Sequence, residues 1–129
     1  FFSTDGNYGV AYGNGKFVTV GHWNSSGKIA YSENGMSWQT ATITGSGFFD
    51  TDQNIRGVAY GGGKWVAVGP TGQIAYSENG TSWEVVDDST FNDSSVIDLF
   101  GVGLINGVAY GNGKWVAVGL YGKMAYCAD

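Results

Sequence analysis

The stretch Gly57-Val-Ala-Tyr-Gly-Gly-Gly-Lys-Trp-Val-Ala-Val-Gly69 occurs three times in this chain, with near copies at Gly9–Gly21 and Gly107–Gly119. In each copy a Gly-Gly-Gly or Gly-Asn-Gly turn separates two short apolar runs, a pattern typical of a β-hairpin. The copies begin 48 and 50 residues apart. The chain is therefore a repeat protein whose unit contains at least one hairpin, with strands we call a and b.

A second phrase, Ile-Ala-Tyr-Ser-Glu-Asn-Gly, follows the first at residues 29–35 and 74–80, and it begins again at Met124. It predicts a third strand, c, and a turn into a fourth strand, d, near Trp38 and Trp83. Four antiparallel strands in 48 to 50 residues match the repeat length of a β-propeller blade. Twenty-three Gly, five Trp, eight Tyr and seven Phe against one Pro agree with short strands and tight turns. The sequence predicts an all-β fold, a β-propeller of four-stranded antiparallel blades.

We expect residues 1–129 to be a single propeller segment of about three blades, two complete and the third truncated. The blades span approximately residues 8–42, 56–87 and 106–129, with long d–a loops at 43–55 and 88–105. Propellers close with about four to eight blades, so further blades are expected. They come from a longer chain, which we favour because the sequence stops inside the second phrase, or from homo-oligomer copies in a six-bladed ring.

The charge composition excludes some partners. Six Lys and Arg against eleven Asp and Glu give a net charge of -5, and no basic stripe is present, so nucleic acid is not an expected partner. No run of 18 apolar residues occurs, so no membrane insertion is predicted.

The single cysteine, Cys127, stands where the other copies have Ser32 and Ser77, which favours a small buried residue.

Differences in segment length point to one end of the blades as the site of function. Antiparallel order places the b–c and d–a segments at one end and the a–b and c–d turns at the other. The a–b turns are equal in length, whereas the first b–c segment, Gly21–Gly27, is three residues longer than its counterparts. Loops on a rigid scaffold usually carry recognition residues. The candidate ligand-binding residues are His22, Trp23, Asn24 and Tyr121.

Trp23 has two interpretations. An aromatic ring among Asn and Ser suits carbohydrate, whose C–H faces stack on rings while its hydroxyls bind polar side chains. Alternatively, Trp23 packs on Phe48 and Phe49 at the same end of the blades. The sequence leaves both interpretations open.

Calcium is the only cofactor that the sequence suggests. Asp50, Asp52 and Asn54 alternate as in oxygen-ligand calcium loops, although Ile55 stands at the glycine position and no Glu follows at the twelfth position. The alternative is a solvated turn that satisfies its own backbone.

Catalytic residues are scarce in this sequence. His22 is the only histidine, so zinc sites and Ser-His-Asp arrangements lack parts. We therefore expect no enzyme activity from this chain.

The segments Ser32–Trp38 and Ser77–Trp83 resemble the Asp-box, or bacterial neuraminidase repeat, whose usual form is Ser-x-Asp-x-Gly-x-Thr-Trp. Both copies are one residue shorter and have Asn at the Asp position. The resemblance implies a scaffold like that of sialidase-like and photosystem II assembly-factor-like propellers. It also implies a structural role in the c–d hairpin for Ser32, Asn34, Gly35, Trp38, Ser77, Asn79, Gly80, Trp83 and Asp129.

Sialidases add three Arg, a Tyr–Glu pair and an Asp to this scaffold. This chain has one Arg, Arg56, so the resemblance implies the scaffold without the sialidase active site.

The leading functional hypothesis is a non-catalytic recognition or adhesion module of a surface or secreted protein. It would bind glycan or protein through the end that carries the b–c and d–a segments, at an extracellular or cell-surface location. The alternative is a structural or assembly propeller subunit, acting as a spacer or an oligomer contact. A weaker alternative is part of a glycoside-hydrolase-like enzyme completed by absent blades.

Overall fold

In the computed structural model, the described residues are 6–23, 26–44, 55–69, 74–86, 105–119 and 124–128, and their regular structure consists of strands. No helix among these residues is long and apolar enough to cross a membrane. The strands are β1 (Gly6–Gly13), β2 (Lys16–Trp23), β3 (Ser26–Ser32), β4 (Gln39–Thr40), β5 (Thr42–Thr44), β6 (Gly57–Gly61), β7 (Lys64–Val68), β8 (Ile74–Ser77), β9 (Ser82–Val86), β10 (Ile105–Gly111), β11 (Lys114–Gly119) and β12 (Met124–Ala128).

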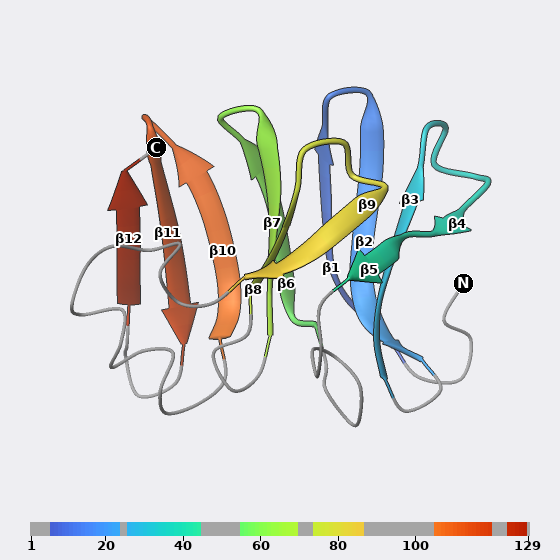
Figure 1. The fold of residues 1–129 in the computed structure, drawn as a ribbon, viewed down its shortest axis with the longest axis horizontal. Coiled ribbons are helices and arrows are strands. Elements are labelled where there is room, and N and C mark those ends of the chain that lie inside the picture. The colour runs from blue at the N-terminus through green and yellow to red at the C-terminus, as the bar shows by residue number, and fades with distance from the viewer. Residues whose placement is uncertain are drawn as a thin grey trace.

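Three sheets lie side by side as blades, with their a–b turns at the same end (Figure 1). Blade 1 has the order β1-β2-β3-β4, and blade 3 has β10-β11-β12. Blade 2 contains β6 to β9 and gains β5 at its outer edge. Within each blade, neighbouring strands along the chain pair antiparallel. This arrangement confirms the predicted all-β fold of propeller blades.

Strand d of blade 1 differs from its prediction. The sequence suggested one strand up to residue 42, followed by a loop from residue 43. Instead, β4 is two residues long, and Ala41 donates its N–H to the Ile29 carbonyl at 2.8 Å. The chain then crosses to blade 2, where β5 pairs parallel with β9. This crossing covers the edge of β9, whose backbone groups would otherwise lack strand partners on that side.

The a–b turns have the conformation that their sequence predicts. Asn14 and Asn112 have φ of 49° and 50°, and Gly62 holds the same place in blade 2 with φ of 58°. The glycine that follows each of them also has positive φ. Two successive positive φ values define the type I′ turn, which suits the right-handed twist of a hairpin.

The core lies between the blades. One cluster joins blades 1 and 2 and includes Val18, Ile29, Trp65 and Trp83. A second cluster joins blades 2 and 3. Strand β7 of blade 2 is apolar on both faces, because a neighbouring blade covers each face.

Glycines at the ends of the a strands allow the blades to approach closely. A β-carbon on Gly13 would overlap the ring of Tyr60, and one on Gly61 would overlap the ring of Tyr110. The tyrosine of each following blade therefore lies directly against the glycine of the preceding blade. Close packing of this kind leaves no room for a methyl group.

Candidate functional site

The first predicted recognition segment is strand rather than loop. Among its described residues, Gly21 pairs with Lys28, His22 with Gly27, and Trp23 with Ser26. His22 also pairs with Gly6 of β1 and is half-buried. The three extra residues of this segment therefore lengthen β2 and β3 instead of forming a wide loop. Pairing in a hairpin gives the backbone N–H and C=O groups of this segment hydrogen-bond partners.

The structure brings His22 and Trp23 to the end of β2. The other two candidate ligand residues, Asn24 and Tyr121, lie outside the described residues. So do the candidate calcium ligands Asp50, Asp52 and Asn54. Within the part of the chain that the structure describes, no three His, Cys, Asp or Glu side chains come close enough to hold a metal ion.

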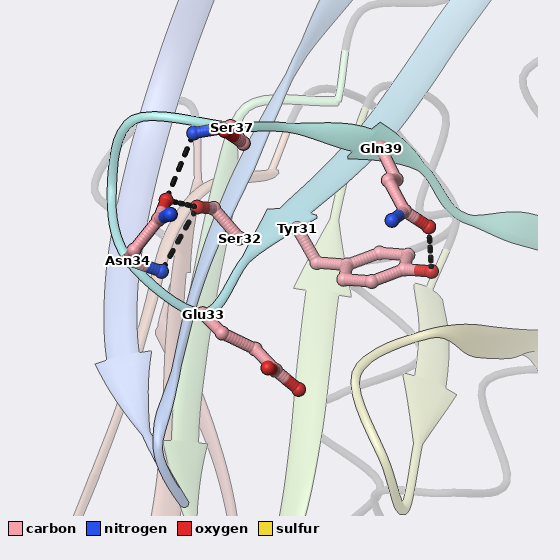
Figure 2. A pocket seen from close by; sticks show the side chains of 6 residues that line it. All are labelled: Tyr31, Ser32, Glu33, Asn34, Ser37 and Gln39. Carbon is pink, nitrogen blue, oxygen red and sulfur yellow. Dashed lines mark hydrogen bonds between the residues drawn. The ribbon is translucent and has the colours of Figure 1, made fainter.

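The turn Ser32–Trp38 is closed by its own side chains. Ser32 Oγ accepts the N–H groups of Asn34 and Gly35, at 3.3 and 2.8 Å, and donates to Asn34 Oδ1 at 3.1 Å. Asn34 Oδ1 also accepts the N–H groups of Met36 and Ser37, both at 2.8 Å. Figure 2 shows Ser32 and Asn34 facing one another inside the turn. Four backbone donors are thus satisfied locally, as is usual for Ser and Asn in turns.

The turn Ser77–Trp83 repeats this network. Ser77 Oγ accepts from Asn79 and Gly80 at 3.2 and 2.8 Å, while Asn79 Oδ1 accepts from Thr81 and Ser82 at 2.8 and 2.9 Å. In both turns the indole N–H of the final tryptophan donates to the glycine carbonyl. Asp129, which stands at the corresponding place in the third copy, lies outside the described residues.

A shallow pocket of about 320 Å³ lies beside the first turn (Figure 2). Tyr31 reaches across the hairpin, and its hydroxyl donates to Gln39 Oε1 at 2.8 Å. The lining residues are all on the c–d hairpin of blade 1: Tyr31, Ser32, Glu33, Asn34, Ser37 and Gln39.

A pocket of about 510 Å³ lies at the same place in blade 2 and is also lined by Thr42 and Thr44 of β5. Here Tyr76 donates its hydroxyl to Glu84 Oε2 at 2.9 Å. The hydrogen bond to the Glu84 carboxylate, together with its negative charge, raises the pKa of Tyr76 above 10.0. We call these two cavities the hairpin pockets.

The hairpin pockets were not predicted from the sequence, although it contains a signal for them. Tyr31 and Gln39 face one another across the c–d hairpin, as do Tyr76 and Glu84, and both pairs have the same separation in sequence. Their Ser and Asn side chains also hold the turns closed. Hydroxyl, amide and carboxylate groups in an open pocket can bind polar ligands, but recurrence in each complete blade also fits a general property of the repeat.

Comparison with known proteins identifies the class of fold. No family model and no curated protein matches the chain. The structure of YCF48 bound to D1 peptide is 16% identical, with a TM-score of 0.72, and the match covers 98% of this chain and 38% of that chain. A protein of Bacteroides thetaiotaomicron with a provisional glycosidase assignment is 14% identical, with a TM-score of 0.50, covering 95% of this chain and 47% of that one.

These identities show the fold alone, which is that of a β-propeller. This chain spans less than half the length of both proteins, at 38% and 47%. We call the turns Ser32–Trp38 and Ser77–Trp83 the box turns. Their resemblance to the Asp-box remains a prediction about family.

Proposed function

We propose that this chain is a non-catalytic recognition module that binds a protein partner through the end of the blades opposite the a–b turns. The observation that carries the proposal is the b–c hairpin of blade 1. Eight residues separate Val20 from Ile29 in blade 1, whereas five separate Val68 from Ile74 in blade 2. The longer connection of blade 1 is paired as far as Trp23 and Ser26, so it extends a hairpin that includes His22 and Trp23.

The opposite end of the blades is less suited to selective recognition. Its a–b turns have the same conformation in all three blades, and its two complete box turns have the same hydrogen bonds. The turns at this end therefore offer the same conformation and the same Ser and Asn groups at each complete blade. Selectivity for one partner requires groups that differ from blade to blade, and the b–c segments differ in sequence, with His22 and Trp23 in the first copy alone.

A protein partner is favoured over a glycan because YCF48, which shares the fold, is bound to a peptide in its structure. Glycan binding through Trp23 is the second candidate, since an aromatic side chain beside Asn and Ser suits a sugar ring. We further propose a cell-surface or extracellular location, supported by the resemblance of the box turns to the bacterial neuraminidase repeat.

Binding of the 129-residue chain to peptide and glycan arrays tests this proposal. We expect binding to peptides, and loss of that binding in a His22→Ala/Trp23→Ala double variant. The matched control is Asn112→Gly in an a–b turn, where blade 2 already has Gly62 at the same φ. Melting temperatures of all variants show whether each one is folded.

Binding to glycans alone would replace the first candidate by the second. Equal loss of binding in the Asn112→Gly control would mean that the partner binds at the end of the blades that carries the a–b turns, which contradicts the proposal. Binding to neither array would favour the structural or assembly role.

A further inference from the structure

Strand β3 is longer than the strand that pairs with it on its outer side. Its pairing with β2 runs over its whole length, from Ser26 to Ser32. Its pairing with β4 covers only Ala30 and Tyr31, and one further hydrogen bond joins the Ala41 N–H to the Ile29 carbonyl at 2.8 Å. Within the described part of the chain, the outer pairing of β3 therefore ends at Ile29.

The pairing ends there because β5 crosses to blade 2. Continuing the register of β3 and β4 would place Ile43 opposite Gly27. Instead, Ile43 pairs with Trp83, and Thr44 Oγ1 donates to the Trp83 carbonyl at 3.2 Å. Figure 1 shows β5 between β4 and β9. The open end of β3 thus results from a crossing inside this chain.

The third strand of blade 2 has no open end of this kind. Strand β8 begins at Ile74, and Ile74 already pairs with Val86 of β9. Strand β9 is in turn covered by β5 on its other side. Of the two complete blades, blade 1 is therefore the one whose strand c extends past its strand d.

The register of blade 1 shows which backbone groups lie on the open edge. The Ile29 carbonyl accepts from Ala41, so the backbone groups of Ile29 point toward β4. Along an antiparallel strand these groups point alternately to the two neighbouring strands. The N–H and C=O groups of Gly27 therefore point outward, whereas those of Lys28 point toward Gly21 of β2. Outward N–H and C=O groups with no described strand beside them can pair with a further strand.

We propose that this edge of β3 binds an extended segment of a protein partner, which adds to blade 1 as a strand opposite Gly27. This inference rests on the function proposed above, because Gly27 pairs with His22 in the extended b–c hairpin. In strand addition, backbone hydrogen bonds contribute to affinity and tolerate many side chains. The partner segment must have a backbone N–H at the paired residue, so proline is excluded there.

Amide hydrogen exchange measured by NMR tests the edge itself. In the free 129-residue chain, we expect the Gly27 amide to exchange quickly and the Lys28 amide, which faces β2, to exchange slowly. The probe is the peptide that binds most strongly on the peptide array described above. At a saturating concentration, this peptide should slow the exchange of Gly27 and leave that of Lys28 nearly unchanged.

A proline variant tests the hydrogen bond of the edge. Gly27→Pro removes the outward N–H but no hydrogen bond to β2, and proline is tolerated on the open side of an edge strand. We expect it to weaken binding of the same peptide about 2- to 10-fold, the net contribution of one hydrogen bond. Gly27→Ala keeps the N–H and is the matched control. Melting temperatures show whether both variants are folded.

Changes in the peptide provide a second test that does not depend on folding of the proline variant. Methylation of one backbone nitrogen of the peptide at a time should weaken binding at alternate residues, because every second N–H of an added strand points toward β3.

The proposal is overturned if the Gly27 amide is already protected in the free chain, since the edge would then be covered. It is also overturned if binding is lost in the His22→Ala/Trp23→Ala variant but is insensitive to backbone methylation of the peptide. In that case the proposed function stands without strand addition. If no peptide binds, both proposals fail.

Discussion

Trp38 of blade 1 and Trp83 of blade 2 end the two box turns and donate to a glycine carbonyl at 3.2 and 3.0 Å. Their surroundings differ. Trp83 is 1% exposed and packs in the core between blades 1 and 2, whereas Trp38 is only half-buried. The backbone of each turn is therefore fixed by local hydrogen bonds, but burial of its tryptophan depends on the preceding blade. The same sequence phrase contributes differently to stability in the two blades.

The largest expected effect is on the buried tryptophan. Trp83→Ala should lower the free energy of unfolding by about 3–5 kcal/mol, because it leaves a cavity between two blades. Trp38→Ala should cost clearly less, since part of its side chain is already in water. Urea denaturation followed by circular dichroism measures both. Equal losses would mean that the preceding blade does not stabilise the second turn as we infer.

The two asparagines should behave alike. Asn34→Ala and Asn79→Ala each remove an oxygen that accepts two backbone N–H groups. We expect each change to cost about 0.5–1.5 kcal/mol, the usual net contribution of an intramolecular hydrogen bond, because the exposed donors can bond to water instead. Asn→Asp at either position keeps the acceptor and serves as the control. A much larger loss in one blade would show that the turns are not closed by local bonds alone.

The a–b turn of blade 2 can be made like that of blade 1. Gly62→Asn should raise the free energy of unfolding by about 0.4–1 kcal/mol, because Asn restricts the unfolded chain and is accepted at positive φ. Asn14 already has this conformation at the same place. Gly62→Ala is the control and should not stabilise, since alanine is strained at positive φ. A melting temperature lowered by Gly62→Asn would contradict the equivalence of the turns.

The smallest effect concerns the hairpin pockets. The pKa of Tyr76 is raised in the folded chain. Its hydrogen bond to Glu84 therefore contributes fully to the free energy of unfolding below pH 10.0, and this contribution is lost as the pH rises through the raised pKa. Glu84→Gln makes this pair like Tyr31–Gln39, and Tyr76 should then titrate at a lower pH. NMR titration of labelled tyrosine side chains measures this change. An unchanged titration of Tyr76 would remove Glu84 as the cause.

The strands and tight turns of this fold could be predicted because their signals are local. Alternation around Trp65 and the Asn-Gly pairs at Asn14 and Asn112 are sufficient for the a–b hairpins. The crossing of β5 could not be predicted, since its partner β9 belongs to another repeat and no local pattern marks a parallel pair. The requirement for glycine at position 61 could not be predicted either. The ring that leaves no room for a β-carbon there is that of Tyr110, which belongs to the next repeat.

The candidate site was less predictable than the fold. The segment after Gly21 was expected to be a loop because it lies between strands b and c and is three residues longer than its counterparts, yet strand pairing extends through His22 and Trp23. The hairpin pockets could have been found from the cross-strand pairs Tyr31–Gln39 and Tyr76–Glu84. Asn24, Tyr121 and the calcium ligands remain predictions that the described residues do not address.

The pairing of β5 with β9 has a consequence for the order in which the chain folds. The hairpins of each blade join neighbouring segments, and such contacts form on a timescale of about 1–10 μs. Strand β5 (Thr42–Thr44) can pair only after its partner β9, which ends at Val86, is available. During synthesis, blade 1 therefore leaves the ribosome with β5 unpaired and acquires its connection to blade 2 only after β9 has emerged. In that interval, β5 is an exposed edge open to pairing with other chains.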